Sequence, residues 1–345
     1  MKAKPLVSVI IVNWNGGETF KKCLDSLSKI HYPRWELIVV DNGSLDQSQT
    51  LVEKYRFTNY QLIQNKHNLG FAEANNQGYE KARGGLILLL NNDTEVSPDL
   101  LDILVSKIQS NSGIGVVQPK ILIMDRPDHL DSVGSFLTKT GFLQHVGYLK
   151  RDTEEYQRER EIFSAKGACM LIKKEVIKKT GLFDREYVSY LEETDFCWRV
   201  WLAGYKIIYY PKAFIYHKVG FTSKKLNQLS VNYHAFKNRL ATLFKNLGFM
   251  NLLFIGSVHL ITILALSLYY LLRLHPKESV VIWRAIGWNL THLVELVKKR
   301  NRVQKIIRLK SDSVIFKSIM QRCDYKDMLD HFLRSQKMLS GQHEV

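Results

Sequence analysis

The sequence predicts an α/β fold built on a mostly parallel sheet flanked by helices. First, short β-branched segments, starting at residues 7–12, alternate with segments of helical periodicity. Second, residues 86–90 are continuously apolar, which is typical of a strand buried on both faces. Third, polar residues follow each of these strand-like segments, where a doubly wound sheet binds its ligands.

The expected elements follow one another in regular order as far as residue 120. We expect strands at 7–12, 36–40, 60–64, 86–90 and 115–120, and helices at 18–30, 47–55, 72–82 and 98–109. Residues 121–162 show little helical or strand periodicity, so we assign no helix or strand to them. The pattern then resumes with a strand at 168–172, a short helix from Lys174, and a helix over 192–203 that ends at Gly204.

Composition and charge limit the classes of protein to consider. A chain of 345 residues with 46% hydrophobic residues can bury one large core with an appendage, which excludes disorder. The net charge of +16 lies mainly in the tail, which from Lys218 onward contains 21 Lys and Arg against 7 Asp and Glu.

The four cysteines lie far apart without a CxxC pair, which argues against a zinc site or a disulfide framework and fits a reducing cytoplasm. The apolar run at 7–12 lacks a signal-peptide cleavage site, so we expect a cytoplasmic catalytic part.

Two acidic residues follow expected strands. Asp93 comes directly after the buried strand, where a carboxylate can hold a divalent cation against a diphosphate. An ordinary turn or helix-capping role for Asp93 is the alternative. Asp41, followed by Asn42, Gly43 and Ser44, is placed to bond a ribose or a base edge.

Two further candidates lie nearer the tail. Glu192, Glu193 and Asp195 open a helix, where carboxylates favour the helix dipole or one of them serves as a general base. His217 is either a metal ligand or a structural histidine. The residues alone leave both questions open.

Read together, these segments carry a family resemblance. The chain resembles family 2 glycosyltransferases of the GT-A fold, especially rhamnosyltransferase-like members that build bacterial or archaeal surface glycans. The matching text is VSVIIVNWNG, ELIVVDNGSLD, NKHNLGFAEANNQG, LILLLNNDTEVSP, GACMLIKKEV, GLFDREYVSYLEETDFCWRVWLAGY and YHKVGFTS. These pieces cover most of residues 6–223 in the family's order and approximate spacing.

The resemblance implies roles for particular residues. It places Asp93 and His217 on a Mn²⁺ or Mg²⁺ ion at the donor diphosphate, and it makes Glu193 the catalytic base with Asp195 as a supporting carboxylate. The family usually has Asp where this chain has Glu193, and many relatives carry an acid where this chain has Asn91. The resemblance also implies an inverting, single in-line displacement, with a donor site formed by Val12, Trp14, Asp41, Asn42, Ser44, Asn68, Gly70, Phe71 and Asn92.

A basic segment follows the matching region. Residues 234–239 look like the family's basic segment after the catalytic domain. Lys237 and Arg239 are therefore expected to pair with a donor or lipid diphosphate, or else to form a solvated basic helix face.

The tail, 224–345, is expected to be a basic helical region behind a catalytic domain at 1–223. Its residues 249–272 belong to a run of 27 uncharged residues, long enough to span a bilayer. A single crossing would leave 15 Lys and Arg on the far side, against the positive-inside tendency. Residues 280–297 form an amphipathic pattern suited to a headgroup boundary. Helices in the cytoplasmic leaflet, a spanning helix or hairpin, and soluble packing or dimerisation all remain open.

The whole set predicts a membrane-bound transferase. We expect transfer of rhamnose or another hexose from a dTDP- or UDP-sugar to a glycan acceptor, lipid-linked if the enzyme is held at a membrane. We expect an anionic membrane surface as partner, on the cytoplasmic face, with peripheral, monotopic or C-terminal transmembrane attachment. The alternative is a non-catalytic sugar-nucleotide-binding scaffold of the same fold. The Gln-x-x-Arg-Trp motif of processive synthases is absent, and the tail has no recognised nucleic-acid module.

Overall fold

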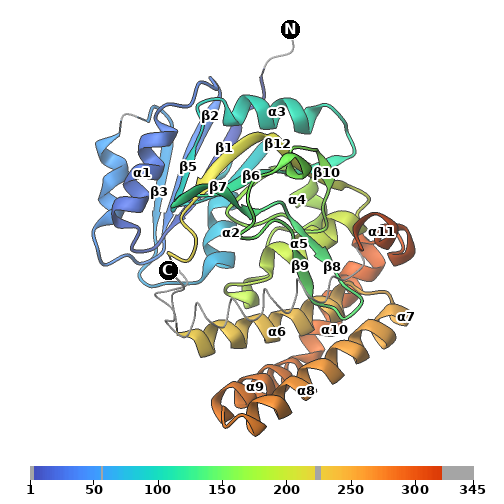
Figure 1. Cartoon of the computed structure of the whole chain (residues 1–345). Helices are drawn as coiled ribbons and strands as arrows, with labels where there is room; N and C mark the ends of the chain where they lie inside the picture. Colours follow the sequence, from blue (N-terminus) through green and yellow to red (C-terminus); the bar gives the residue numbers. More distant parts are fainter. Residues whose placement is uncertain (1–3, 56, 222–226, 321–345) are drawn as a thin grey trace.

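The strand-like segments pair into one ten-stranded sheet in the computed structural model, which describes residues 4–55, 57–221 and 227–320 (Figure 1). The order along the sheet is β10-β12-β6-β11-β4-β1-β2-β3, with β5 paired to β12 and β7 paired to β6. Strands β8 and β9 form a separate hairpin. The α/β fold with a mostly parallel sheet is confirmed.

Four parallel strands make one half of the sheet. They are β1 (Val7–Asn13), β2 (Trp35–Asp41), β3 (Tyr60–Gln64) and β4 (Leu86–Asn91). The register pairs Asn13 with Asp41 and Val12 with Asn91. The polar residues at the carboxyl ends of three strands therefore meet at one edge of the sheet.

The other half of the sheet mixes strand directions. It consists of β6 (Ile114–Ile123), β11 (Cys169–Lys173), β12 (Lys206–His217), β10 (Arg160–Glu161), β5 (Thr94–Val96) and β7 (Arg126–Ser132). β11 runs antiparallel to both β4 and β6, whereas β12 runs parallel to β6. β12 also pairs with β5, and this places His217 opposite Thr94, the residue after Asp93.

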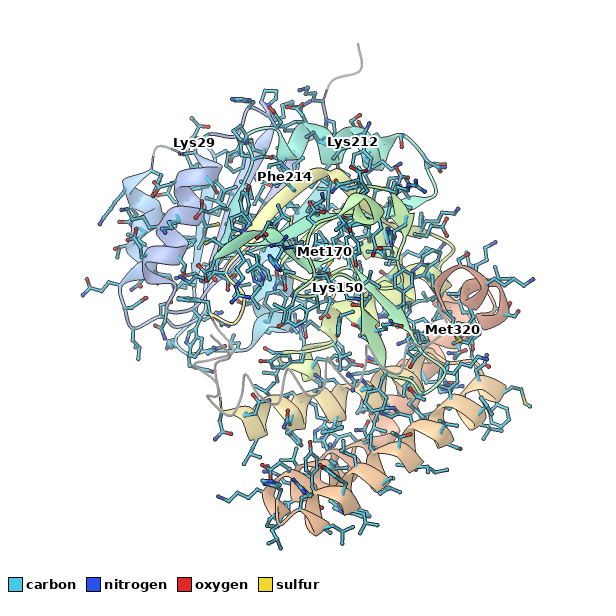
Figure 2. The ribbon with its side chains drawn as sticks, viewed as in Figure 1. Lys29, Lys150, Met170, Lys212, Phe214 and Met320 are labelled. Carbon is cyan, nitrogen blue, oxygen red and sulfur yellow. The ribbon has the colours of Figure 1, made fainter. Side chains whose placement is uncertain are left out.

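Helices cover both faces of the sheet, which explains why its central strands are apolar on both sides. Met170 of β11 is fully buried between the layers (Figure 2). One face carries α1 (Gly17–Leu27) and α3 (Leu100–Gln109), and the other carries α2 (Phe71–Lys81), α4 (Lys174–Thr180) and α5 (Glu192–Leu202).

The helix expected at 47–55 is instead a 3₁₀ helix, η1 (Ser48–Lys54). Gln47 enters it with a left-handed φ of 59°. Ser48 is also held from both sides, because its Oγ donates to Asp46 Oδ1 at 2.6 Å and accepts from Asn13 Nδ2 at 2.8 Å. Such a short, tightly anchored segment favours 3₁₀ geometry over a regular α-helix.

The segment without expected elements, 121–162, contains very short ones. Strand β6 extends into it as far as Ile123, and β7 follows. It then forms β8 (Ser135–Leu137), β9 (Leu143–His145), η2 (Glu154–Tyr156) and β10. Most of these pieces are two or three residues long, so they carry too little periodicity to be recognised from sequence.

The C-terminal region forms a second layer beneath the sheet (Figure 1). Helix α6 (Gln228–Asn246) contacts α5, and α8 and α9 form the outermost layer. Residues 249–272 are continuously helical, as α7 (Phe249–Asn251), the π-helical turn η5 (Leu252–Gly256) and α8 (Ser257–Leu272). The amphipathic helix expected at 280–297 is divided at His292 into α9 (Pro276–Thr291) and α10 (Leu293–Arg302), followed by η6 (Val303–Ile307) and α11 (Asp312–Ile319).

A buried carboxylate joins α5 to α6. Asp195 is fully buried, and its Oδ1 accepts from Asn246 Nδ2 at 2.7 Å and lies 3.1 Å from Lys245 Nζ. Its Oδ2 accepts from Arg199 Nε at 3.0 Å. Burial alone would raise the pKa of Asp195, but Lys245 and Arg199 outweigh it and hold the pKa below its usual value. Asp195 is thus an ion-paired anchor between α5 and α6.

We expect Asp195→Asn to lower the free energy of unfolding by about 3 kcal/mol, because Arg199 and Lys245 stay buried without their carboxylate. The value lies at the low end for a broken buried pair, since Lys245 retains Asp184 at 2.7 Å. Because folding lowers the pKa of Asp195, this stabilisation is present above the unfolded-state pKa and is lost as the pH falls through the folded-state value. Urea unfolding of both proteins at neutral and acid pH measures it.

The control is Glu295→Gln, which removes a carboxylate from the exposed pair with Lys298. This variant should unfold at the same urea concentration as the parent protein. Equal stabilities of Asp195→Asn and Glu295→Gln would contradict the anchoring role of Asp195.

Candidate functional site

Asn13 is the centre of a polar network at the carboxyl ends of β1 and β2. Its Nδ2 donates to Asp41 Oδ1 at 3.0 Å, and its Oδ1 accepts from Asn92 Nδ2 at 2.9 Å. The other oxygen of Asp41 accepts from the backbone N–H of Ser44 at 3.1 Å. The network therefore joins three of the expected donor-binding residues, Asp41, Ser44 and Asn92, in fixed orientations.

Asn42 organises the turn that follows β3. Its Oδ1 accepts from the backbone N–H of Leu69 at 3.0 Å, and its Nδ2 donates to Asn68 Oδ1 at 2.9 Å. Gly70 ends this turn with φ of 87°, and a Cβ there would lie 2.6 Å from the Val188 carbonyl oxygen. Only glycine allows the turn to pack this closely on the segment before Glu192.

Three further expected donor residues border this network. Val12 pairs with Val40 and Asn91 on neighbouring strands, and Trp14 follows Asn13 with its side chain half-buried. Phe71 begins α2 and packs against Phe183 with ring centroids 6.0 Å apart. The structure thus gathers the sequence-predicted donor residues of 12–92 at one edge of the sheet.

Asp93 and His217 form a buried pair beside this edge. Asp93 Oδ1 lies 3.2 Å from His217 Nε2 and accepts no hydrogen bond from any other residue that the structure describes. His217 Nδ1 lies 2.8 Å from Asp131 Oδ2, and the other oxygen of Asp131 accepts from Lys166 Nζ at 2.6 Å. A continuous chain of charged groups therefore runs from Asp93 to Lys166.

The charges around His217 set its protonation. Burial alone would lower the pKa of His217, but Asp93 and Asp131 outweigh it and raise the pKa to about 9. Burial would raise the pKa of Asp131, whereas Lys166 and His217 hold it well below its usual value. Without a bound cation, the positive charges on His217 and Lys166 together balance the two buried carboxylates.

The Asp93–His217 pair fits a divalent cation. Two ligands at adjacent octahedral positions, each about 2.1 Å from the ion, lie about 3.0 Å apart, close to the separation of these two atoms. A neutral His217 that donates from Nδ1 to Asp131 leaves Nε2 free as a ligand, the usual arrangement of metal-binding histidines. The described residues contain no group of three or more His, Cys, Asp or Glu that could hold a metal. The other ligands would therefore come from a bound diphosphate and water.

A strained loop presents Glu192 and Glu193 at the start of α5. Val188, Tyr190 and Leu191 have positive φ values of 63°, 72° and 67°. Such conformations cost free energy and persist only where surrounding contacts enforce them. The contacts come from Asn238 of α6, whose Nδ2 donates to the carbonyl oxygens of residues 187, 189 and 190 at 3.0, 3.0 and 2.7 Å.

The two glutamates differ in ionisation. Burial raises the pKa of Glu192 well above its usual value, and the charge of Glu193 raises it further. Burial also raises the pKa of Glu193. Hydrogen bonds from its surroundings and the charge of Lys166 act in the opposite direction and limit this increase. Glu193, the more exposed of the two, is therefore the glutamate that ionises first.

Lys237 and Arg239 have surroundings of their own. Lys237 Nζ donates to the Glu186 carbonyl oxygen at 2.6 Å, and burial lowers the pKa of Lys237 to about 8. Arg239 lies 4.7 Å above the Phe142 ring, and burial lowers its pKa to about 10. Lys237 is thus engaged with the Glu192 loop, and neither side chain has a described contact with the donor residues of 12–92.

Sequence reasoning missed Asp131, Lys166 and Asn238. Asp131 lies in the segment 121–162, for which no helix or strand was expected, and Lys166 lies just after that segment. A proposed metal ligand such as His217 needs an acceptor for its second ring nitrogen, and this requirement was the available signal. Asn238 lies inside the basic segment 234–239, of which only the cations Lys237 and Arg239 were considered as candidates.

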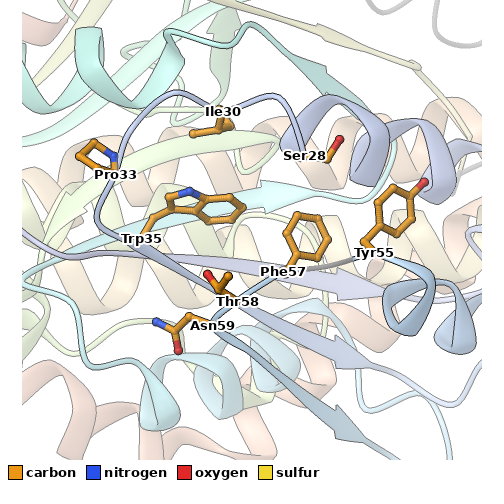
Figure 3. Close-up of a pocket in the computed structure, with 8 residues that line it drawn as sticks. All are labelled: Ser28, Ile30, Pro33, Trp35, Tyr55, Phe57, Thr58 and Asn59. Carbon is orange, nitrogen blue, oxygen red and sulfur yellow. The ribbon is translucent and has the colours of Figure 1, made fainter.

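A cavity of about 360 Å³ lies at the opposite end of the sheet (Figure 3). Its walls include Trp35, which begins β2, and Asn59, which precedes β3. Parallel α/β sheets bind ligands at the carboxyl ends of their strands, so this amino-end cavity is separate from the site above.

The chain resembles known proteins in sequence. The family described as Glycosyl transferase family 2 matches residues 8–181. An uncharacterized protein of Sinorhizobium fredii is 30% identical over 232 residues, covering 63% of this chain and 25% of that protein. The poly-beta-1,6-N-acetyl-D-glucosamine synthase of Staphylococcus epidermidis is 23% identical over 208 residues, covering 60% of this chain and 48% of the synthase. The chain thus spans at most about half the length of these relatives.

Solved structures share the fold. The 1–349 chain of S. aureus TarS, in complex with UDP-GlcNAc, superposes with a TM-score of 0.56 at 16% identity, covering 88% of this chain and 84% of that chain. The mannosyltransferase PcManGT of Pyrobaculum calidifontis, in complex with GDP-Man and Mn²⁺, gives 0.52 at 17% identity, covering 84% of this chain and 88% of that chain. These neighbours agree with the expected GT-A-like sheet.

We expect Mn²⁺ to bind at Asp93 and His217 when a nucleoside diphosphate is present. Asp93→Asn should weaken Mn²⁺ binding at least tenfold because it removes the anionic ligand, and Asp131→Asn should weaken it about 10–100-fold through His217. Electron paramagnetic resonance titration of Mn²⁺ in the presence of UDP measures the affinities. The control is Asp152→Asn, since Asp152 pairs with Lys120 instead. Unchanged Mn²⁺ affinity in Asp93→Asn would contradict the site.

Proposed function

Because the chain belongs to glycosyl transferase family 2, we propose that it transfers a sugar from a nucleotide-sugar donor to a lipid-linked glycan acceptor at the cytoplasmic face of a membrane. The observation that carries the proposal is the Asp93–His217 pair at the carboxyl ends of the strands, beside an ordered polar network and a loop presenting Glu193.

The donor lies along the edge formed by β1, β2 and β4. Asp41, held by Asn13 and Ser44, faces the nucleoside, and the turn at 68–70 closes the same side. Asp93 and His217 would hold a divalent cation, and a bound cation would supply positive charge to stabilise the departing diphosphate. The donor is a dTDP- or UDP-sugar carrying rhamnose or another hexose.

Glu193 acts on the acceptor. Its carboxylate takes the proton from the acceptor hydroxyl as the hydroxyl oxygen forms a bond to the anomeric carbon. The bond from that carbon to the diphosphate breaks in the same step, and the nucleoside diphosphate leaves from the opposite face. The configuration at the anomeric carbon is thereby inverted. Asp195 positions the helix on which Glu193 lies, through Lys245 and Asn246.

The membrane part of the proposal rests on the outer face of α7–α10. The helix over Phe249–Leu272 is long and apolar enough to cross a bilayer by length and composition, with a mean hydropathy of 2.1. The inner side of this helix, however, packs on α9 and α6. Ser267 of α8 and Ser279 of α9 share a buried hydrogen bond at 2.7 Å. Its outer side exposes an apolar stripe, hereafter the α8 stripe: Leu253, Phe254, Leu260, Ile261, Leu268 and Leu272.

The charge of these helices fits an anionic membrane surface. Residues 249–319 contain 11 Lys and Arg against 3 Asp and Glu. An apolar face combined with an excess of cations is typical of helices lying in the headgroup boundary. We therefore favour monotopic attachment through the α8 stripe over a single spanning helix, and this location gives the enzyme access to a lipid-linked acceptor.

We expect Glu193→Gln to abolish sugar transfer while leaving donor affinity within about twofold, because the amide cannot accept the proton. The parent enzyme should lose kcat/KM toward acid pH, through a pKa above the ordinary 4.5, since burial raises the pKa of Glu193 and its protonated form is inactive. A panel of nucleotide sugars with Mn²⁺, followed by product analysis and calorimetric donor binding, provides both measurements and identifies the donor.

The matched control is Glu192→Gln. Burial and the charge of Glu193 raise the pKa of Glu192 well above its usual value, which favours the neutral acid. An amide imitates the neutral acid, so this variant should retain most of the transfer activity. Full activity in Glu193→Gln would contradict the assignment of the base. Binding of a donor without turnover by the parent protein would favour the non-catalytic scaffold.

We expect the double variant Phe254→Asp/Ile261→Asp to bind anionic phospholipid vesicles at least tenfold more weakly, since two apolar side chains that are 63% and 66% exposed can no longer insert. Vesicle co-sedimentation measures the affinity. Tyr60→Asp changes an exposed aromatic residue on the edge strand β3 and should bind as the parent does. Equal binding by all three proteins would exclude the α8 stripe as the membrane face.

A further inference from the structure

A cavity of about 610 Å³ lies between the N-terminal parts of α6 and α9. The α6 side contributes Asn227 and Tyr233, and the α9 side contributes Lys277, Val280 and Arg284. The volume lies within the range of small-molecule sites in proteins. The cavity belongs to the C-terminal helices and shares no lining residue with the Asp93–His217 site.

The cavity is lined by two cations, Lys277 and Arg284, that have no anionic partner among residues 4–55, 57–221 and 227–320. Arg284 lies 5.2 Å from the Tyr233 ring centre, and neither Arg284 nor Lys277 forms an ion pair or hydrogen bond within the described residues. Burial and the charge of the adjacent acid, Glu278, raise the pKa of Tyr270, so this carboxylate lies near α8. Two unpaired cations on one cavity make it complementary to an anionic group.

Two helix N-termini add to this positive potential. Helix α6 begins at Gln228, directly after the cavity residue Asn227, and α9 begins at the cavity residue Pro276. The helices are 19 and 16 residues long, so each carries a full macrodipole with its positive end at the cavity. Phosphate is the group that such an arrangement binds best, because its several oxygens accept from more than one donor.

The cavity continues into an apolar surface. Val280 lines the cavity and is 53% exposed, and Trp283 and Leu290 follow it at helical spacing with exposures of 55% and 66%. We call these three residues the α9 stripe. A ligand with an anionic head in the cavity can therefore lay a hydrocarbon chain along α9.

We propose that this cavity binds the phosphate headgroup of a lipid, with Lys277 and Arg284 on the phosphate and the α9 stripe beside the hydrocarbon chain. The inference rests on the membrane attachment in the proposed function. A bilayer phospholipid and a polyprenyl phosphate acceptor share this chemistry, a phosphate ester on a long hydrocarbon chain. In the second case the cavity would be part of the acceptor site.

The test compares the full chain with Lys277→Gln/Arg284→Gln and with Arg302→Gln/Lys305→Gln. The second pair removes the same charge from exposed cations outside the cavity. Co-sedimentation uses phosphatidylcholine vesicles alone, or with either phosphatidylglycerol or polyprenyl phosphate added at equal charge. The cavity variant should lose at least tenfold more affinity than the control variant for at least one added lipid, and the affected lipid identifies the occupant.

Equal losses in the two variants with both lipids would overturn the proposal, because unspecific surface attraction depends on charge alone. Nucleotide-sugar hydrolysis in solution should be unchanged in both variants. A cavity-specific loss in a protein that turns over no donor would uphold the lipid site while the transferase proposal fails. Normal nucleotide-sugar hydrolysis, combined with equal losses of lipid affinity in the two variants, would uphold the transferase proposal while the lipid site fails.

Discussion

The buried carboxylate of Asp195 is the interaction on which the arrangement of the molecule depends. A fully buried charge must be paired, and its partners Lys245 and Asn246 both lie on α6. Helix α6 is thereby fixed to α5, whose first turn carries Glu193. The same helix holds the strained loop through Asn238 and supports α8 and α9 on its other side. The proposed base and the proposed membrane face are therefore connected through α6.

This connection suggests how a lipid-linked acceptor would meet the donor. The donor residues lie at strand ends, whereas the acceptor is proposed to arrive from the layer of α8 and α9. The contacts through α6 fix the position of Glu193 relative to the proposed membrane face. The proposed proton transfer requires such precision because it operates over hydrogen-bond distances. A loosely tethered membrane anchor would not impose this geometry.

Much of the fold could be predicted from sequence, because buried parallel strands and amphipathic helices produce clear patterns of apolar residues. The strands and helices up to residue 120 lie close to their expected positions, apart from η1, which side-chain bonds to Ser48 tighten. The hairpin β8–β9 and β10 could not be predicted, since such short strands depend on tertiary contacts. For the site, Asp93 followed from its place after a strand. Its relation to His217 depends on β12 pairing with β5, and Asp131 lay in the unassigned segment.

The central claim is that Asp93 and His217 hold the cation and diphosphate of a nucleotide-sugar donor. The most direct measurement is a crystal structure of the protein with Mn²⁺ and UDP, using the anomalous signal of manganese. The account predicts a manganese peak bonded to Asp93 Oδ1 and His217 Nε2, with the diphosphate completing its coordination and the nucleoside beside Asp41. Manganese and UDP bound elsewhere, with Asp93 and His217 still paired directly, would contradict it.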